Sequence, residues 1–305
     1  MKKDFISIKD LTLKEIEDIF ALTGQLKGNS AQFNQALKGK TIALVFQKPS
    51  NRTRVSFEVG IYQLGGLAIY LGPNEINLGV RESIHDVAKT LSRYVNGVVL
   101  RTYEHQNVLE MAKYASIPII NGLSDLLHPC QALADLYTAK EKLGSLKGLK
   151  LAYIGDGNNV CHSLLYACSK TGMNMSVASP KGYECVSALV KEAKTLAKET
   201  GSLIELFNKS DQAAKGADVI YTDVWASMGQ EKEAQKRAKA FKGFQVNKKL
   251  LSLANSGCLI MHCLPAHRGQ EITDDVIDSE NSVVFDEAEN RLHVQKAILI
   301  KLLSV

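Results

Sequence analysis

Short apolar runs alternate with amphipathic stretches along most of this chain. An apolar run of roughly four to eight residues is typical of a buried strand, whereas apolar residues at intervals of three and four indicate a helix. Strands are predicted at 41–46, 67–71, 97–102, 117–122, 149–155, 175–179, 203–207, 218–224, 258–264 and 282–285. Helices are predicted between most of them, at 83–95, 107–115, 131–144 and 185–199. The alternation predicts an α/β fold of mainly parallel sheets flanked by helices.

The ends and the middle of the chain add detail to this prediction. Thr12 and Glu15 form a capping-box pattern ahead of a first helix. The chain has 305 residues, and a domain takes about 150 as a soft prior. A glycine-punctuated turn at 144–150 follows a long predicted helix that begins at Pro129. We expect domains at 1–143 and 144–288, joined by interdomain helices, with a helix at 289–305 that returns to the first domain.

Composition narrows the class of protein. The net charge is +5 with only one Trp, and no run of basic residues exceeds a pair, which disfavours nucleic-acid binding and suits a small anionic substrate. The N-terminus lacks the apolar core of a signal peptide, and no apolar run approaches the ~18 residues needed to span a membrane. The six cysteines are scattered without a C-x-x-C motif. Reduced thiols in a cytoplasmic protein are the simplest interpretation.

The segment SNRTR, residues 50–54, lies between the predicted strand 41–46 and a helical pattern carried by Val55, Val59 and Tyr62. It therefore opens a helix. Backbone N–H groups at a helix start attract anions, and hydroxyl and guanidinium groups suit phosphate oxygens. A solvated basic turn is the alternative for such a segment taken alone.

Other strand ends of the first half carry further donors. Arg101 ends the strand 97–102, and His128 and Gln131 flank the start of the helix that Pro129 opens. Each residue alone could be a surface arginine or a capping residue. Because the carboxyl ends of parallel strands meet at one edge of a sheet, their combination favours an oxyanion site.

Strand ends of the second half offer different chemistry. The turn at 155–159 resembles a dinucleotide fingerprint, but Val160 occupies the third glycine position and the next strand ends at Ser179 without a carboxylate. Asn158 or Asn159 could instead contact a ligand or only form a tight turn.

Asp223 ends a later strand and suits an ammonium group. A metal site at His262, Cys263 and His267 is disfavoured, because Pro265 breaks the spacing and three or four convergent ligands are needed.

The ordered motifs SNRTR, RTYEH, HPCQ, GDGNN, DVWASMG and HCLP cover nearly the whole chain and resemble the ornithine carbamoyltransferases of the aspartate/ornithine carbamoyltransferase superfamily. The resemblance implies catalytic roles for Arg101, His128, Asp223 and Cys263. It implies that ornithine is held by Asn159, Asp223, Ser227 and Met228. It implies that carbamoyl phosphate is held by Ser50, Asn51, Arg52, Thr53, Arg54, Asn77, Arg101, His128, Gln131, Cys263, Leu264 and Arg291.

The same resemblance implies transfer of the carbamoyl group to the ornithine side-chain amine, without metal or organic cofactor. It also implies a cis Leu264–Pro265 bond and a homotrimer in which the loop with Asn77 and Arg81 reaches a neighbouring subunit's site. Asn51 replaces a threonine that is usual in the family, and Asn77 replaces a longer glutamine, so carbamoyl phosphate affinity is expected to differ from that of relatives. Arginine synthesis and degradation both remain open.

Alternative functions differ in testable ways. A carbamoyltransferase for putrescine, lysine or acylated ornithine would share the first-half motifs. A nucleotide-binding oxidoreductase would bind NAD tightly, and a regulatory or nucleic-acid-binding protein would bind duplex without turnover. No nucleic acid, membrane or cofactor is expected among the partners of this chain.

Overall fold

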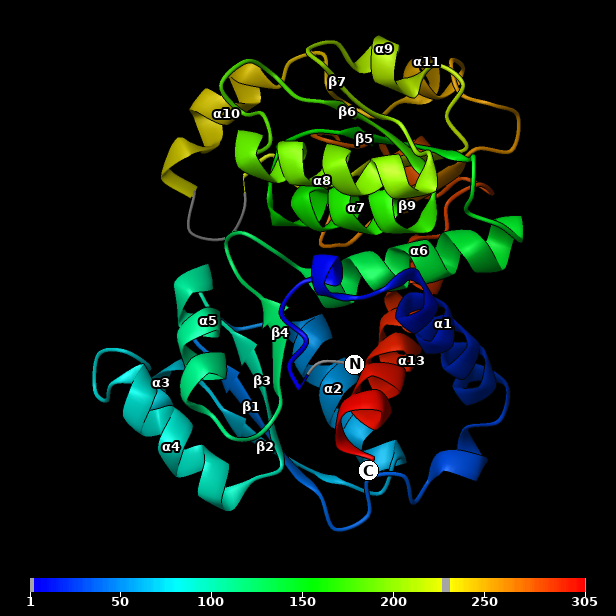
Figure 1. Ribbon diagram of the computed structural model, residues 1–305. Helices are drawn as coiled ribbons and strands as arrows, with labels where there is room; N and C mark the ends of the chain where they lie inside the picture. The colour runs from blue at the N-terminus through cyan, green and yellow to red at the C-terminus, as the bar shows by residue number, and fades with distance from the viewer. Residues whose placement is uncertain (1–2, 227–230, 305) are drawn as a thin grey trace. The chain divides into compact units, whose positions relative to one another are not determined.

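A computed structural model describes residues 3–226 and 231–304. Its described residues divide into two compact units along the chain (Figure 1). The first unit comprises the residues up to Ala134 together with those from Glu289 onward, and the second comprises Asp135–Ala288. Helix α6 (Pro129–Leu143) and helix α13 (Val284–Leu303) each contain one of the two division points. No helix within the described ranges is long and apolar enough to cross a membrane.

The sheet of the first unit has the strand order β2-β1-β3-β4, with every described pairing parallel. Its strands are β1 (Thr41–Phe46), β2 (Leu67–Leu71), β3 (Gly97–Arg101) and β4 (Ile119–Leu123). Figure 1 shows α3, α4 and α5 along one face, and α1, α2 and α13 along the other. This arrangement confirms the predicted parallel sheet flanked by helices.

The helices of the first unit begin and end where local sequence favours it. Their bounds are α1 (Leu13–Gly28), α2 (Asn51–Gln63), α3 (Pro73–Ile76), α4 (Ile84–Tyr94) and α5 (His105–Tyr114), with short 3-10 turns η1 (Ile8–Asp10) and η2 (Ser30–Phe33). The predicted capping box of Thr12 and Glu15 at α1 is confirmed. Helix α2 buries Phe57 and Ile61, whereas its apolar stripe of Val55, Val59 and Tyr62 is exposed.

The sheet of the second unit has the order β7-β6-β5-β8-β9 and is likewise parallel in its described pairings. Its strands are β5 (Lys150–Ile154), β6 (Asn174–Ala178), β7 (Ile204–Phe207), β8 (Val219–Thr222) and β9 (Leu259–His262). The helical segments are α7 (Asn159–Thr171), α8 (Ser187–Thr200), α9 (Ser210–Ala214), η3 (Glu231–Glu233), α10 (Ala234–Ala240), α11 (Lys248–Leu251) and α12 (Asp274–Ile277). The predicted two-domain α/β fold class is confirmed.

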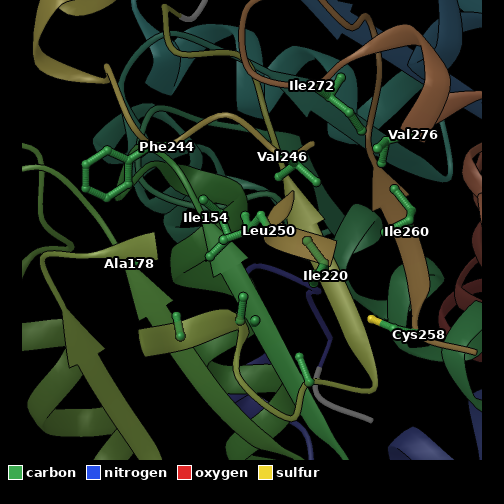
Figure 2. Close-up of a cluster of buried hydrophobic side chains, with 14 of the residues drawn as sticks. Ile154, Ala178, Ile220, Phe244, Val246, Leu250, Cys258, Ile260, Ile272 and Val276 are labelled. Atoms are coloured by element: carbon green, nitrogen blue, oxygen red, sulfur yellow. The ribbon is translucent and has the colours of Figure 1, made fainter. Parts of the chain in front are cut away.

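Alternation along the strands assigns side chains to the two faces of this second sheet. Ile154, Ile220 and Ile260 point into the apolar cluster of Figure 2, where Phe244 and Val246 pack against them. The neighbouring positions Tyr153 and Tyr221 must then lie on the opposite face, and their rings stack with centroids 5.8 Å apart. The sheet is therefore buried on both faces, as parallel sheets are.

One predicted strand is wrong. Residues 282–285 form only a single bridge, between Ser282 and Ile260, and helix α13 already begins at Val284. Asp286 lies in the first turn of α13, where negative charge stabilises the helix start. A short apolar run does not distinguish a strand from the start of a buried helix, so the run alone misled the prediction.

Candidate active site

In each sheet of the described residues, successive strands are first added on one side of the starting strand and then on its other side. This reversal of the strand order lies between β1 and β3 in the first unit, and between β5 and β8 in the second. The carboxyl ends of strands beside such a reversal form the usual ligand site of an open α/β sheet. Arg101 is the last residue of β3, and the segments that begin at Ser50, Gly155 and Asp223 follow β1, β5 and β8. The predicted chemistry therefore lies where the fold favours binding.

The SNRTR segment forms the start of α2, as predicted. Ser50 is the N-cap, and its hydroxyl oxygen accepts a hydrogen bond of 3.2 Å from the Thr53 N–H. Asn51 is exposed, Arg52 is partly buried and Thr53 is buried. The Nε of Arg52 is buried and makes no hydrogen bond to the described residues. A guanidinium donor held at a helix N-terminus in this way suits an anionic ligand.

The hydroxyl of Thr53 accepts hydrogen bonds from two other predicted site residues. Arg291 Nη2 donates to Thr53 Oγ1 over 2.7 Å, and Arg101 Nη1 donates to the same oxygen over 3.5 Å. Arg291 Nη1 donates to Gln131 Oε1 over 2.7 Å. Strand β3, helix α2, helix α6 and helix α13 thus bring Arg101, Thr53, Gln131 and Arg291 together within the first unit.

His128 lies buried among positive charges. It directly precedes α6, and its carbonyl accepts the Ala132 N–H over 3.2 Å. Burial holds the pKa of the His128 imidazole well below its usual value, and the charges of Arg291 and Arg101 lower the pKa further. The imidazole is therefore neutral, and the surrounding positive charge favours an anion rather than a second cation.

Lys48 belongs to the same positive region, although sequence reasoning missed it. It follows β1, is 8% exposed, and its Nζ lies 4.7 Å from the centroid of the Tyr103 ring. Burial and then the charge of Arg101 lower the pKa of Lys48. The signal available in the sequence was its position between the end of strand 41–46 and Ser50.

Arg54 and Asn77 lie apart from the Thr53 network. Arg54 is exposed, pairs with Glu58 over 3.0 Å and stacks its guanidinium 3.7 Å from the Tyr70 ring centroid. Asn77 is exposed at the end of α3 with a left-handed φ of 41°. The adjacent Leu78 carbonyl accepts a hydrogen bond of 2.8 Å from Gln47 Nε2, so the loop base is fixed while its tip projects.

In the second unit, Asn158 organises the site. Its Oδ1 accepts hydrogen bonds from the N–H groups of Val160 and Cys161, over 3.0 and 3.1 Å, which caps α7. Its Nδ2 donates to Asp223 Oδ2 over 2.7 Å. Of the two asparagines considered from the sequence, Asn158 thus holds Asp223, whereas Asn159 is the first residue of α7.

Asp223 is a buried carboxylate with several donors. Besides Asn158, it accepts hydrogen bonds from the Val224 N–H over 2.8 Å and the Cys263 thiol over 3.1 Å. Burial and the neighbouring Asp223 raise the pKa of Cys263 well above its usual value, so Cys263 is a thiol donor rather than a thiolate. Ser227 and Met228, predicted to grip ornithine, lie outside the described residues.

A second carboxylate near this site was not predicted. Asp156, within the Gly155–Gly157 turn, accepts a hydrogen bond of 2.9 Å from Arg237, which also donates to the Trp225 carbonyl over 2.9 Å. Burial raises the pKa of Asp156 to about 6, against the effect of Arg237. Arg237 thus connects the Asp156 turn to the segment that follows Asp223. No local sequence motif predicts this long-range contact.

The neighbourhood of Cys263 also bears on metal binding. Ligand atoms of Asp223, His262 and Cys263 lie within 4.8 Å of one another. However, His262 Nε2 pairs with Glu271 over 3.2 Å, and His262 Nδ1 accepts the Leu264 N–H over 2.8 Å. The ring is therefore engaged at both nitrogens, which fits a positioning role for the loop. The predicted cis bond between Leu264 and Pro265 is confirmed.

Comparisons with known proteins agree with these two half-sites. Residues 3–141 match the family domain described as "Aspartate/ornithine carbamoyltransferase, carbamoyl-P binding domain", and residues 147–302 match the "Asp/Orn binding domain" of the same family. A protein of Thermococcus kodakarensis named ornithine carbamoyltransferase is 54% identical over 97% of this chain and 95% of its own length. A Bacillus subtilis protein of the same name is 52% identical over 97% of this chain and 92% of its own length.

Solved structures give the same result. The structure titled as the ornithine carbamoyltransferase from Pyrococcus furiosus has a TM-score of 0.96 and 52% identity, covering 98% of this chain and 96% of that one. The structure of the enzyme so titled from Thermus thermophilus has a TM-score of 0.90 and 43% identity, covering 99% of both chains. The likeness in sequence and in fold extends over both units, and it confirms the resemblance inferred from the motifs. The chain therefore belongs to the aspartate/ornithine carbamoyltransferase family.

Proposed function

We propose that this chain transfers the carbamoyl group of carbamoyl phosphate to the side-chain amine of L-ornithine, giving L-citrulline and phosphate. The observation that carries the proposal is the meeting of Arg101 and Arg291 on the buried Thr53 hydroxyl at the start of α2. That arrangement offers converging cationic donors to a small phosphorylated ligand. The family membership and the high identity to proteins named ornithine carbamoyltransferase point to the same reaction.

The first domain, residues 1–143, would hold carbamoyl phosphate. The start of α2 supplies Ser50, Asn51, Arg52 and Thr53 for the phosphate, while Arg101 and neutral His128 face the carbamoyl oxygen. The Thr53 oxygen accepts hydrogen bonds from Arg291 and Arg101, and its own O–H would donate to the ligand. A neutral imidazole donates an N–H to a developing oxyanion, and such preorganised donors are the main source of rate acceleration in acyl transfer.

The second domain, residues 144–288, would hold ornithine through its α-amino and α-carboxylate groups. Asp223 is a buried carboxylate fixed by Asn158 and Cys263, which suits it to an ammonium group. The neutral side-chain amine of ornithine attacks the carbamoyl carbon, a tetrahedral oxyanion forms, and phosphate leaves while taking the amine proton. Charge on the departing phosphate is neutralised by Arg52 and its neighbours. These residue roles remain predictions.

The geometry of the GDGNN turn disfavours the oxidoreductase alternative. A Cβ atom at Gly157 would lie 2.2 Å from the backbone nitrogen of Cys185, and the Gly157 N–H donates to the Tyr183 carbonyl over 2.8 Å. The glycine therefore makes room for the chain's own 183–185 segment. In a dinucleotide site the corresponding glycine makes room for a pyrophosphate.

An amine panel tests the reaction and its substrate. Purified protein is incubated with carbamoyl phosphate and, separately, with L-ornithine, putrescine, lysine or N-acetylornithine, and each carbamoylated product is quantified by mass spectrometry. We expect citrulline formation to exceed every other product at equal amine concentration. Preferential carbamoylation of another amine would replace ornithine in the proposal, and absence of any transfer would overturn the proposal.

We further propose a homotrimer with active sites shared between subunits, located in the cytoplasm. Exposed apolar side chains on α2 and on the edge strand β2 suit contact with a second copy of this chain. They are Val55, Val59 and Tyr62 on α2, and Leu67 and Ile69 on β2. The loop with Asn77 and Arg81 is exposed beyond its anchor at Leu78, as a loop that reaches a neighbouring site must be.

Complementation between inactive variants tests the shared site. Arg81→Glu would place a negative charge near a neighbour's phosphate, whereas Arg52→Ala would disable a site from within its own chain. Each pure variant should be nearly inactive. After the two are unfolded together and reassembled, some interfaces combine an intact loop with an intact SNRTR segment, so part of the wild-type activity should return. If verified mixed trimers remain inactive, the site is not shared.

A further inference from the structure

Two cysteine thiols lie against each other beside the predicted ornithine site. The Sγ atoms of Cys161 and Cys185 are 3.3 Å apart, and both residues are free thiols. Cys161 lies in the first turn of α7, and Cys185 lies in the segment just before α8. Neither thiol is among the residues assigned above to carbamoyl phosphate or ornithine.

The surroundings of the two thiols make them unequal. A hydrogen bond from Cys161, and further interaction with His162, lower the pKa of Cys185 to about 6 despite its burial. Burial raises the pKa of Cys161 well above its usual value, so Cys161 is the protonated partner. Cys185 is 8% exposed whereas Cys161 is fully buried. Both residues are buried, and a low-pKa thiol next to a second thiol is the usual arrangement of a peroxide-sensitive pair.

Both cysteines are connected to the ornithine half-site through short contacts. Asn158 Oδ1 accepts the Cys161 N–H over 3.1 Å, and Asn158 Nδ2 donates to Asp223 over 2.7 Å. On the other side, the segment that carries Cys185 packs directly on Gly157, where a Cβ atom would lie 2.2 Å from the Cys185 nitrogen. A shift of either cysteine therefore moves the turn that positions Asp223.

We propose that Cys161 and Cys185 form a reversible disulfide switch that closes on exposure to a peroxide and weakens the use of ornithine. The Cys185 thiolate attacks one oxygen of hydrogen peroxide, the O–O bond breaks, and Cys185 becomes a sulfenic acid as hydroxide leaves. The Cys161 thiol then attacks that sulfur, the S–O bond breaks, and water leaves with the disulfide formed. The hydroxide takes up the proton that Cys185 had released and becomes water, so two thiols are oxidised as one peroxide is reduced to two waters. A low-molecular-weight thiol reverses the step by exchange.

The size of the effect follows from the geometry. A disulfide bond is about 2.05 Å long, so the two sulfur atoms, now 3.3 Å apart, must approach by about 1.3 Å. A misplacement of about 1 Å in a positioning element can cost on the order of 100-fold in rate. We therefore expect kcat/KM for ornithine to fall by about 10- to 100-fold. Phosphate binding should change little, because its predicted donors lie in the other unit. This expectation rests on the proposed function.

Peroxide treatment of the full-length protein tests the switch. Wild type, Cys161→Ala, Cys185→Ala and the control Cys258→Ala are treated with hydrogen peroxide, and free thiols are then blocked. Peptide mass spectrometry detects a Cys161–Cys185 cross-link, citrulline assays give kcat/KM for ornithine, and calorimetry gives the affinity for inorganic phosphate. Cys258 is the matched control because it is a buried thiol of the same unit, away from this pair.

Wild type and Cys258→Ala should form the cross-link, lose ornithine kcat/KM and regain it with dithiothreitol. Cys161→Ala and Cys185→Ala should start near wild-type activity and keep it in peroxide. The switch is overturned if no cross-link forms, if the cross-linked protein keeps its ornithine kcat/KM, or if both alanine variants lose activity like wild type. Absence of citrulline formation by the reduced wild type would instead contradict the proposed function, while the cross-link would still be tested by mass.

Discussion

Replacement of Thr53 by valine removes one buried hydroxyl and keeps almost the same volume. In the folded protein this hydroxyl accepts a hydrogen bond of 2.7 Å from Arg291 and a long one of 3.5 Å from Arg101. Valine leaves both guanidinium groups without this acceptor. The perturbation therefore isolates the polar contact from the packing of the side chain, which is 1% exposed.

The expected magnitude comes mainly from the shorter bond. A hydrogen bond to a charged group contributes about 1.5–3 kcal/mol net, while the bond at 3.5 Å lies at the limit of useful geometry. We expect Thr53→Val to lower the free energy of unfolding by about 2 kcal/mol. Thr53→Ser keeps the acceptor and loses a methyl group, which costs about 1 kcal/mol. Valine should thus be less stable than serine.

Urea unfolding at one fixed protein concentration measures both variants against wild type. Their citrulline turnover should follow the same order, because the hydroxyl is also assigned to the carbamoyl group. If valine is more stable than serine, packing of the methyl group outweighs the hydroxyl, and the central role given to Thr53 is refuted.

Further predictions concern other residues of the site. Because the pKa of buried His128 lies well below 6.5, the unfolded chain gains a proton below pH 6.5 that the folded chain does not. The free energy of unfolding should therefore fall as pH drops below about 6.5, and His128 should contribute up to about 1.4 kcal/mol per pH unit to this fall. In urea titrations at several pH values, His128→Gln should remove this contribution to the dependence of the unfolding free energy on pH. Arg101→Ala should lower kcat by about 10²- to 10³-fold while phosphate affinity, measured by calorimetry, changes far less; near-normal turnover would remove Arg101 from its role. Asp223→Asn should raise KM for ornithine by about 10- to 100-fold and leave phosphate affinity nearly intact; equal losses for both ligands would indicate a folding defect.

Local pattern was sufficient to predict most strands of this fold. The strands around β1 and β5 are apolar runs with turn residues on both sides, and the pattern fails only where the run 282–285 opens a helix. The exposure of Val55, Val59 and Tyr62 was also not apparent, because an apolar stripe at helical spacing reads as a buried face whether the protein or another subunit covers it.

The candidate site was predictable as a set of strand ends but not in its contacts. Asn158 and Asn159 are adjacent, and only the exact start of α7 decides which one becomes the cap that holds Asp223. Arg237 reaches Asp156 through a tertiary contact that has no local signature, whereas Lys48 could have been found from its position just after the strand 41–46. Arg54 belongs to the SNRTR segment, from which a phosphate contact was predicted, yet its guanidinium stacks on Tyr70. The boundary at residue 144 and the roles of the individual residues remain predictions.

The stoichiometry of a single reaction is the sharpest test of carbamoyl transfer by this protein. Purified protein is mixed with ¹³C-labelled carbamoyl phosphate and L-ornithine, and labelled citrulline and released phosphate are followed together by NMR. After subtraction of the spontaneous decay of carbamoyl phosphate, we expect one citrulline for each phosphate, at a rate that saturates with both substrates. Phosphate release without labelled citrulline, or no reaction above the spontaneous decay, would contradict it.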